Sequence, residues 1–452
     1  MYGSSYVSKS LDPSDSSDRT GPRAHPSGRT RPSLRARLGV RARSNVRTRR
    51  GIRPRLNFWA RSACRARPGR RPRSDHRTRL EYWANDLDGL DRTILTNLTA
   101  QSCSMGRQAS RSSSHPASFL ANASYSRKRI VPAFYVFGDS TVDAGNNNNL
   151  NTLAKANAFP YGIDFNNCST GRFSNGKTFA DLIAIRLGLP MPPPYLGVPK
   201  SERHKAVTGI NYASGSCGIL NSTRVGDCLS LDKQIEYFTL TVANDLPRSI
   251  HSKTKLRHYL SNSIYLLSIG SNDYMLNYFK YPNGTNNNLN PEKYADYLLE
   301  QLASRIKRIY DLGARKFVVS TIGQIGCTPT CVIRIPYSQK CNEDINQKVK
   351  HYSDKLPGKL QDLQTQLSHS IFINLDNYNF SQKIRNSPEN FGFKNIFDSC
   401  VQGRKPCAKR NEYYFFDFAH PTEATNKIYA NECFSGTQLC LPYNISKLIH
   451  AH

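Results

Sequence analysis

Three polar segments in the C-terminal two thirds of the chain carry side chains that could act together in nucleophilic catalysis. The first is Gly138–Asn148, which holds Ser140 directly after an apolar run. A serine on a tight turn between a strand and a helix is exposed at the sheet edge, and the helix N-terminus favours negative charge beside it. Such a setting suits a nucleophile. From this segment alone, Ser140 could equally well serve only as a helix cap.

The second segment, near the C-terminus, offers a general base for this serine. Asp417 stands three residues before His420, so its carboxylate can hold the imidazole in the tautomer that accepts a proton. His420 is the only one of the eight histidines after residue 130 with an acidic residue at that spacing. We therefore predict that Asp417 and His420 act with Ser140.

The third segment, Gly270–Asp273, follows another apolar run and contains Asn272. An asparagine amide at a strand end can donate to an oxyanion, a contact worth about 3–4 kcal/mol in other enzymes. Taken by itself the segment also has the composition of an ordinary turn.

The elements that must position these groups alternate between short apolar runs and helical patterns, which predicts βαβ units and a mostly parallel sheet. The strands are expected at Ala133–Gly138, Ser263–Gly270, Arg315–Ile322 and Ile371–Asp376. Helices are expected at Lys177–Leu187, Pro291–Leu312, Asn342–Leu367 and Thr422–Cys433. In such a sheet the ligand crevice lies at the carboxyl ends of the strands, which is where the polar segments are found.

Four ordered motifs carry a resemblance to a known family. They are FGDSTVDAGNNN at 137–148, GINYASGSCGIL at 209–220, SIGSNDY at 268–274 and FFDFAHPTEATN at 415–426. Together they resemble the plant GDSL esterase/lipase family of the SGNH hydrolase superfamily. The resemblance covers about residues 131–447.

This resemblance implies a fold and a set of catalytic roles. The fold would be an α/β three-layer α/β/α sandwich with a parallel five-stranded sheet, of the flavodoxin-like kind. Ser140 would be the nucleophile, His420 the base and then the acid, and Asp417 the group that orients His420. The family needs no metal and no organic cofactor, so none is expected.

The resemblance also implies an oxyanion hole. It would be made by the backbone N–H groups of Ser140 and Gly218 and by the side chain of Asn272. Gly215 competes with Gly218 for the second position. We prefer Gly218, because its place before Ile219 is more similar to that of the family's glycine.

Positive charge is concentrated in the N-terminal part of the chain. Residues 1–130 hold 28 of the 63 Lys and Arg but only 8 of the 33 Asp and Glu. A stretch so rich in Arg, Ser and Pro cannot bury enough apolar surface to order itself, so we predict a disordered extension and linker over 1–128 and a hydrolase domain over 129–447. A basic arm that binds nucleic acid or another polyanion is the alternative, supported by charge alone.

Cysteine usage favours an oxidising compartment. Ten of the twelve cysteines lie after residue 130, and the closest pairs, Cys400–Cys407 and Cys433–Cys440, are the ones most expected to form disulfides. Five Asn-x-Ser/Thr sequons after residue 130 add to this expectation; they begin at Asn167, Asn221, Asn283, Asn379 and Asn444. We therefore expect a secreted glycoprotein, although the chain shows no recognisable signal peptide and no transmembrane segment.

A cluster of Cys327, Cys331 and Cys341 raises the possibility of a zinc site. Structural zinc sites usually combine two short Cys/His pairs, and no second pair stands at that spacing. Local disulfides are therefore the preferred interpretation.

The predicted function is hydrolysis of carboxylic esters through a serine acyl-enzyme. The partner would be an acyl ester, either a small molecule such as an acylglycerol or an acetyl ester on a polymer. Two alternatives stay open: an acyltransferase that uses the same three residues, and a non-catalytic protein that binds polyanions. No nucleic acid partner is expected, and nothing in the sequence predicts an oligomeric state.

Overall fold

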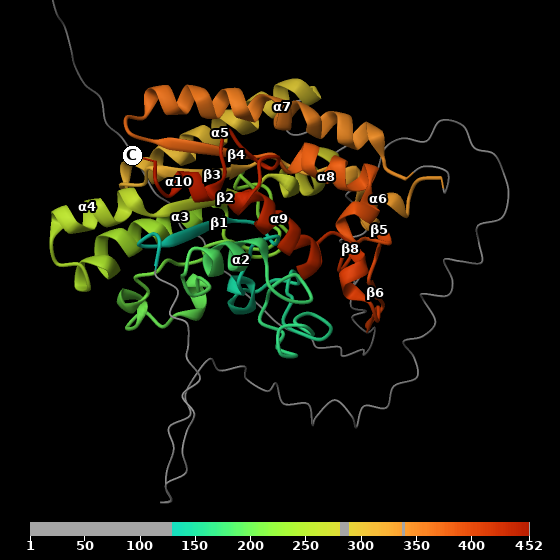
Figure 1. Ribbon diagram of the computed structural model, residues 1–452, viewed down its shortest axis with the longest axis horizontal. Helices are drawn as coiled ribbons and strands as arrows, with labels where there is room; N and C mark the ends of the chain where they lie inside the picture. Colours follow the sequence, from blue (N-terminus) through green and yellow to red (C-terminus); the bar gives the residue numbers. More distant parts are fainter. Residues whose placement is uncertain (1–128, 281–288, 337–339, 452) are drawn as a thin grey trace, which may run out of the picture. The chain divides into compact units, whose positions relative to one another are not determined.

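The computed structural model describes residues 129–280, 289–336 and 340–451 (Figure 1). The predicted disordered extension, residues 1–128, lies outside these residues, so that prediction stays open.

A five-stranded sheet forms the centre of the fold (Figure 1). Its strands, in spatial order, are β1 (Phe134–Gly138), β2 (Ile264–Ser268), β3 (Lys316–Ser320), β4 (Ile371–Leu375) and β9 (Cys440–Leu441). The first four are parallel and agree with the predicted strands. The fifth differs from the predicted wholly parallel sheet, because β9 is antiparallel to β4. It returns directly after the last long helix, without the crossover that a parallel neighbour requires.

Helices cover both faces of this sheet. The longer ones are α2 (Phe179–Arg186), α3 (Leu231–Leu240), α4 (Lys253–Asn262), α5 (Pro291–Asp311), α7 (Glu343–Gln366), α8 (Asn377–Asn386) and α9 (Glu423–Ser435). Two shorter helices are α6 (Pro329–Val332) and α10 (Ile445–Leu448). The four predicted helices, now α2, α5, α7 and α9, are confirmed to within two residues at each end. Helices α3, α4 and α8 were not predicted.

Side-chain alternation on the strands builds the three layers. On β1, Tyr135 and Phe137 belong to the apolar core beneath α3, α5 and α7. Phe134 and Val136 belong to the opposite core, beneath α2, α9 and α10. Because successive side chains of a strand point to opposite faces, a strand buried on both sides reads as a continuous apolar run. The predicted α/β/α sandwich is therefore confirmed.

A strand-like segment, residues 208–214, continues the sheet beyond β1. The N–H of Phe134 donates to Thr208 O at 3.1 Å, and the N–H of Tyr212 donates to Val136 O at 2.8 Å. Gly209 lies closest to β1, with a φ of +113°, and a Cβ at this position would stand 1.9 Å from Phe134 O. Only glycine allows this approach. The pairing brings the second sequence motif alongside the strand that leads to Ser140.

The disulfides among the described cysteines include Cys217–Cys228, Cys327–Cys341, Cys400–Cys407 and Cys433–Cys440. The last two are the pairs predicted from proximity, and they are confirmed. In the described part of the chain, Cys327, Cys341 and Glu343 lie close enough together to be considered as ligands of a metal ion. Since the two sulfurs are bonded to each other, they offer no thiolates to a zinc ion.

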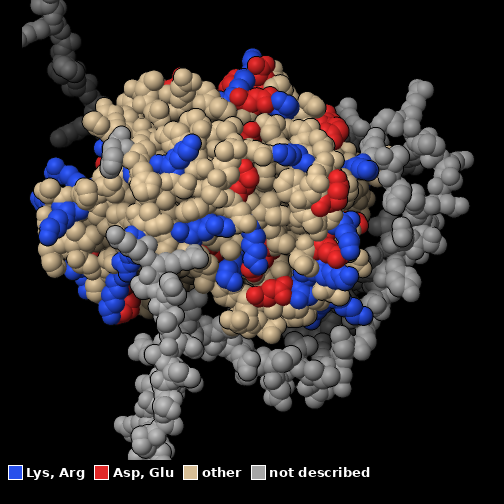
Figure 2. Space-filling view, viewed as in Figure 1, with Lys and Arg blue, Asp and Glu red and all other residues tan. Residues whose placement is uncertain are grey.

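The surface of the described domain mixes charges of both signs. On the face shown in Figure 2, Lys and Arg stand beside Asp and Glu. Exposed ion pairs of the described residues include those of Lys355 with Glu292 and Asp296. Such interspersed charge is typical of a solvated surface. Within the described ranges, no helix is both long and apolar enough to cross a bilayer.

Gln234 of α3 fixes the end of β1. Its Oε1 accepts the Gly138 N–H at 2.9 Å, while its Nε2 donates to Gly138 O at 2.9 Å and to Leu229 O at 2.8 Å. Its side chain is fully buried, at 0% exposure. The strand end two residues before Ser140 is thus held by the side-chain amide of Gln234.

We predict that Gln234→Leu lowers the free energy of unfolding by about 2–4 kcal/mol, because it leaves buried polar groups without partners. Urea denaturation followed by circular dichroism measures this change. The control is Gln361→Leu on the exposed side of α7, which should change stability by less than about 0.5 kcal/mol. Equal effects of the two substitutions would contradict this role for Gln234.

Candidate active site

Ser140 lies on the turn that follows β1. The turn is stabilised by Asp139, whose Oδ1 accepts the N–H of Thr141 at 3.0 Å and its hydroxyl at 2.7 Å. Asp139 is 2% exposed, and burial raises the pKa of its carboxyl. The helix expected directly after Ser140 is absent: turns lead to a short 3₁₀ helix at Asn146–Asn149. Ser140 caps no helix, and its hydroxyl contacts a histidine instead.

The structure brings the three predicted catalytic residues together. His420 Nε2 lies 2.7 Å from Ser140 Oγ, although the two residues are 280 positions apart in the chain. His420 Nδ1 lies 2.8 Å from both carboxylate oxygens of Asp417. This is an unbroken line of hydrogen bonds from a serine hydroxyl through an imidazole to a carboxylate.

Main-chain hydrogen bonds join the two ends of the loop that carries Asp417 and His420. It follows β8 (Tyr413–Phe415), which pairs in parallel with β5 (Asn395–Ser399) outside the main sheet. The N–H of Phe416 donates to His420 O at 2.8 Å. One residue past the loop, the N–H of Thr422 donates to the Tyr414 carbonyl at 2.9 Å. The Thr422 hydroxyl then caps α9 by accepting from Thr425 N–H. The spacing of Asp417 and His420 is therefore fixed by main-chain bonds.

Asp417 is kept ionised by its hydrogen bonds. Its carboxylate accepts the main-chain N–H groups of Ala419 and His420 at 2.9 and 2.8 Å, and the Tyr161 hydroxyl at 2.7 Å. Burial by itself raises the pKa of Asp417, but the charge of His420 and these donors outweigh it and lower the pKa below its usual value. For His420, burial lowers the pKa, and the carboxylate of Asp417 more than offsets it, so the pKa is raised above 6.5.

Tyr161 is a contact of the candidate site that sequence reasoning missed. Its ring packs edge-on against Phe173 and Phe416, with centroids 6.1 and 5.7 Å away. Phe173 in turn lies 4.9 Å from the His420 ring. Tyr161 sits 256 residues before Asp417, in a segment without regular secondary structure. No periodicity or spacing in a single sequence marks such a contact.

The first two sequence motifs are joined by buried hydrogen bonds. Asp143 accepts the N–H of Asn146 at 2.8 Å and that of Gly215 at 3.1 Å. The amide of Asn146 donates to the carbonyls of Asn211 and Ala213 at 2.9 and 2.8 Å. Asp143 is fully buried, and this burial raises its pKa to about 6. The turn bearing Ser140 and the loop predicted to supply an oxyanion donor are thus a single unit.

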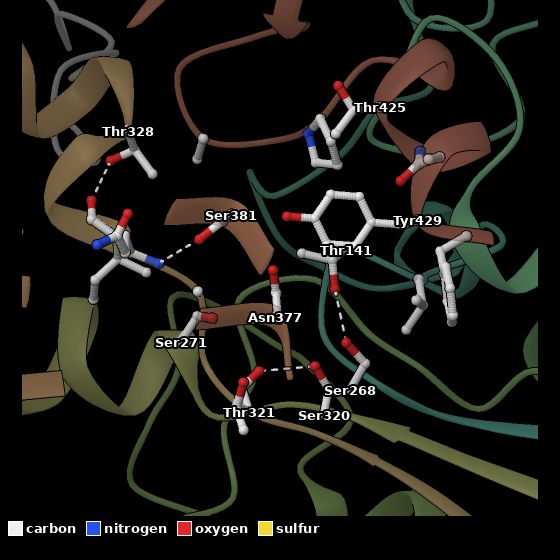
Figure 3. Close-up of a pocket in the computed structure, with 18 of the residues that line it drawn as sticks. Thr141, Ser268, Ser271, Ser320, Thr321, Thr328, Asn377, Ser381, Thr425 and Tyr429 are labelled. Carbon is white, nitrogen blue, oxygen red and sulfur yellow. Dashed lines mark hydrogen bonds between the residues drawn. The ribbon is translucent and has the colours of Figure 1, made fainter. Parts of the chain in front are cut away.

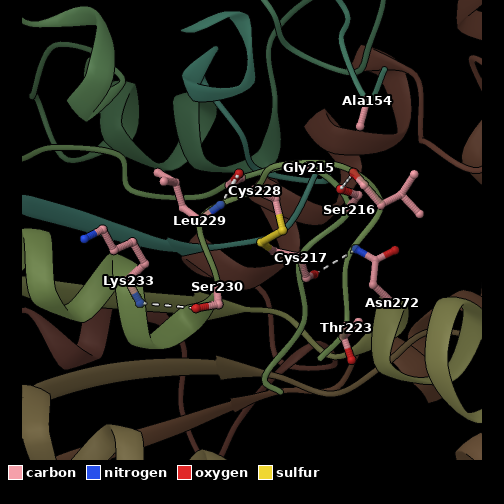
Figure 4. Close-up of a disulfide and its surroundings, with 12 residues drawn as sticks. Ala154, Gly215, Ser216, Cys217, Thr223, Cys228, Leu229, Ser230, Lys233 and Asn272 are labelled. Carbon is pink, nitrogen blue, oxygen red and sulfur yellow. Dashed lines mark hydrogen bonds between the residues drawn. A yellow bond between two sulfur atoms is a disulfide. The ribbon is translucent and has the colours of Figure 1, made fainter. Parts of the chain in front are cut away.

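Asn272 contacts that same loop (Figure 4). Its Nδ2 donates to the carbonyl of Cys217 at 2.9 Å, and Cys217 is joined to Cys228 by a disulfide. Asn272 is 7% exposed, and the second hydrogen of its amide stays available to a ligand. The disulfide and the amide together fix the loop beside Ser140.

The two glycine candidates for the oxyanion hole differ in their surroundings. The Gly215 N–H is occupied, since it donates to Asp143. The Gly218 N–H has no acceptor among the described residues. However, in a trans peptide the C=O and N–H point in opposite directions. The Cys217 carbonyl and the Gly218 N–H belong to the same peptide group. Because the carbonyl points to the Asn272 amide, the Gly218 N–H points away from this amide. The role of Gly218 therefore stays a prediction.

Gly218 has a clear structural role beside Asp273. A Cβ at position 218 would stand 2.4 Å from a carboxylate oxygen of Asp273. That carboxylate accepts the N–H groups of Ile219 and Leu220 at 2.8 and 3.0 Å and the Thr223 hydroxyl at 2.8 Å. Burial raises the pKa of Asp273 to about 6. The residue after Asn272 thus anchors the loop that Asn272 contacts.

Fold and site define an α/β/α-sandwich protein with a hydrogen-bonded serine, histidine and aspartate at the carboxyl end of the sheet. The family model described as GDSL-like Lipase/Acylhydrolase matches residues 134–433. This chain belongs to that family, whose membership supports ester hydrolase activity. The resemblance predicted from the four motifs is confirmed.

Relatives with curated descriptions agree with this assignment. GDSL esterase/lipase 7 of Arabidopsis thaliana is 40% identical over 325 residues, which cover 68% of this chain and 88% of the relative. GDSL esterase/lipase At1g71691 of the same plant is 36% identical over 335 residues, covering 71% and 86%. Among solved structures, protein YXIM of Bacillus subtilis is 13% identical, with a TM-score of 0.26 over 67% of this chain and 54% of that one. That structural similarity is too low to carry an argument.

We predict that Asp417→Asn lowers the pKa of His420 relative to the wild type. Burial lowers that pKa, and the substitution removes the negative charge that offsets it. An NMR pH titration of the His420 ring signal measures the change, with His420→Ala identifying the signal. An unchanged pKa in a folded variant would contradict the described coupling.

Proposed function

We propose that this protein hydrolyses carboxylic esters through a covalent acyl-enzyme on Ser140. The observation that carries the proposal is the line of hydrogen bonds from Ser140 Oγ to His420 Nε2 at 2.7 Å and from His420 Nδ1 to Asp417 at 2.8 Å. Membership of a family of esterases and lipases supports the same chemistry.

The residues suggest the following steps. His420 Nε2 takes the proton of the Ser140 hydroxyl as its oxygen attacks the ester carbonyl. The imidazolium then gives this proton to the departing alcohol, which leaves the acyl group bonded to Ser140. A water molecule, deprotonated by His420 in its turn, attacks the acyl carbonyl. The bond to Ser140 Oγ then breaks, the imidazolium returns its proton to this oxygen, and the acid leaves. Throughout, the Asp417 carboxylate stabilises the imidazolium.

The negative charge on the carbonyl oxygen needs donors beside Ser140. We assign the Ser140 N–H and the Asn272 amide to this role, with Gly218 as the predicted third donor. The Ser140 N–H has no acceptor among the described residues, and the Asn272 amide uses only one hydrogen in its bond to Cys217. Donors that are held in place by buried hydrogen bonds need no reorganisation when the charge develops.

We also propose that the protein is secreted. The disulfide-bonded cysteines of the described domain support an oxidising compartment. Free thiols at these positions in protein isolated under native conditions would contradict the proposal. Of the predicted glycan acceptors, Asn444 is 5% exposed and its amide donates to Gly436 O, so it is unsuited to carry a glycan in the folded protein.

We predict that the wild type hydrolyses p-nitrophenyl acetate and that Ser140→Ala lowers kcat by at least about 10³-fold, since it removes the nucleophile. Release of p-nitrophenol measures both. Thermal unfolding of the variant confirms that it is folded. Equal turnover by the two proteins would remove Ser140 from the mechanism. A folded wild type that is inert on every ester tested would overturn the proposed function.

A further prediction concerns Tyr161 as a positioning residue. Tyr161→Phe keeps the ring packing but removes one donor from Asp417, so we expect a loss in kcat/KM of about 3–10-fold. The less stabilised carboxylate is a stronger partner for imidazolium, which raises the pKa of His420. Since the base must be neutral, the acid limb of the kcat/KM profile should move to higher pH. Tyr297→Phe at the surface is the control. An acid limb in the wild-type position would assign Tyr161 a purely structural role.

A further inference from the structure

One end of the described domain departs from the mixed charge of the rest of its surface. In Figure 2, Lys and Arg gather over the end where Figure 1 shows α4. Segments 198–207 and 243–262 hold seven Lys and Arg but only two acidic residues, Glu202 and Asp245. We call this the basic surface. Its exposed cations are Lys200, Lys205, Arg248, Lys253, Lys255 and Arg257.

Hydrogen bonds hold the two segments of the basic surface against each other. The Ser249 hydroxyl donates to His204 O at 2.6 Å, which joins the end of the first segment to the turn before α4. The Tyr259 hydroxyl, on α4 itself, donates to Val207 O at 3.0 Å. The cations of both segments therefore belong to one continuous surface.

The two carboxylates compensate little of this charge. Asp245 is 8% exposed, and burial raises the pKa of its carboxyl, a rise that the charges of Arg203 and Arg248 oppose. Glu202 forms an ion pair of 2.6 Å with Lys205. The other five exposed cations of the basic surface have no ion pair with a carboxylate of the described residues.

Helix α7 shows the opposite arrangement. Its lysines are paired with carboxylates at 2.5–2.6 Å: Lys348 with Asp344, Lys350 with Asp354, and Lys359 with Glu300 of α5. The positive charge on α7 is thus balanced locally, whereas the charge on α4 is not.

The sequence of α4 adds to its positive potential. The helix contains no acidic residue, and Lys253 and Lys255 stand in its first turn. The N-terminus of a helix carries a partial positive charge, so cations at this place are unfavourable for the helix and favourable for an anionic ligand.

The side chains around these cations restrict the kind of anion. No exposed large apolar side chain belongs to segments 198–207 and 243–262, so the basic surface lacks the apolar groups with which a basic helix inserts into a membrane. The aromatic rings are occupied. Arg203 lies 3.9 Å from the Tyr195 ring, and the Tyr259 hydroxyl is hydrogen-bonded, so no ring is offered to a nucleobase. Recognition must therefore rest on charge.

The spacing of the cations matches a polymer with regularly repeated charge. Lys253 and Arg257 are four residues apart on α4, which is about 6 Å along the helix axis. This distance is comparable with the length of one sugar unit. A polysaccharide with a carboxylate on every sugar can thus place successive anions beside successive cations.

The basic surface is separate from the candidate active site. Helix α4 leads directly into the amino end of β2 at Ile264. The pocket beside Ser140 lies at the other end of the strands, where Figure 3 shows Ser268 and Ser320, the last residues of β2 and β3. A polymer on the basic surface therefore leaves the serine accessible.

We propose that the basic surface binds an acidic polysaccharide that carries a carboxylate on each sugar, and so retains the protein on that polymer. This binding is additional to ester hydrolysis and does not depend on it. The proposed secretion favours a polysaccharide over a nucleic acid as the anionic partner.

The test measures binding of the full chain to immobilised polygalacturonate at low ionic strength, by biolayer interferometry. Lys253→Gln/Lys255→Gln/Arg257→Gln should raise Kd at least about tenfold and make the loss of affinity with added salt shallower, because fewer counterions are displaced. The matched control, Lys348→Gln/Lys350→Gln/Lys359→Gln on α7, removes the same net charge and should change Kd less than about twofold. Residues 1–128 are identical in all three proteins, so any contribution from them cancels. Thermal unfolding confirms that the variants are folded.

Three results would contradict the proposal. The first is a wild type that does not bind polygalacturonate. The second is an equal loss of binding by the two triple variants, or no loss by the α4 variant, because net charge alone would then explain the affinity. The third is a larger effect of the α4 variant on binding to phosphatidylserine vesicles or to dextran sulfate, which would replace the carboxylated polymer by a lipid or a sulfated one. None of these results bears on ester hydrolysis, which Ser140→Ala tests separately.

Discussion

The structure depends on one contact, the 2.7 Å approach of His420 Nε2 to Ser140 Oγ across 280 residues of sequence. A hydrogen bond of this length tolerates little displacement, so both of its ends must be held independently. Gln234 fixes the end of β1 on one side. Main-chain hydrogen bonds from Phe416 to His420 and from Thr422 to Tyr414 fix the histidine loop on the other side.

The motifs that resemble the family are structural units as much as catalytic ones. Most of their polar residues do not face a substrate: Asp143 and Asn146 hold the loop of the second motif, and Asp273 holds its far end. These side chains are buried and fully used, which is the condition under which a polar network stabilises one arrangement. Asn272 lies between two such anchors. These anchors therefore fix the orientation of the Asn272 amide without a further loop.

Electrostatics at the candidate site follow from the same burial. Asp417 is surrounded by donors, including Tyr161, and stays charged, whereas Asp143 and Asp273 have their pKa values raised to about 6. The difference lies in the hydrogen-bond partners: Asp417 accepts from a group that can become a cation, while the donors to Asp143 and Asp273 are neutral N–H and O–H groups. A base with a raised pKa beside a charged carboxylate is suited to accept and return a proton near neutral pH.

The sequence by itself determined the residue types and the elements with long, regular patterns. Strands β1 to β4 and helices α5 and α7 were predicted because their apolar runs are continuous or repeat every turn. Ser140, Asp417, His420 and Asn272 were named because their motifs are local. Only the tertiary structure decided which of these side chains meet, that β9 runs antiparallel, and that Tyr161 donates to Asp417. The physical reason is that such contacts join segments far apart in the chain, through single hydrogen bonds whose partners leave no periodic signal in the sequence.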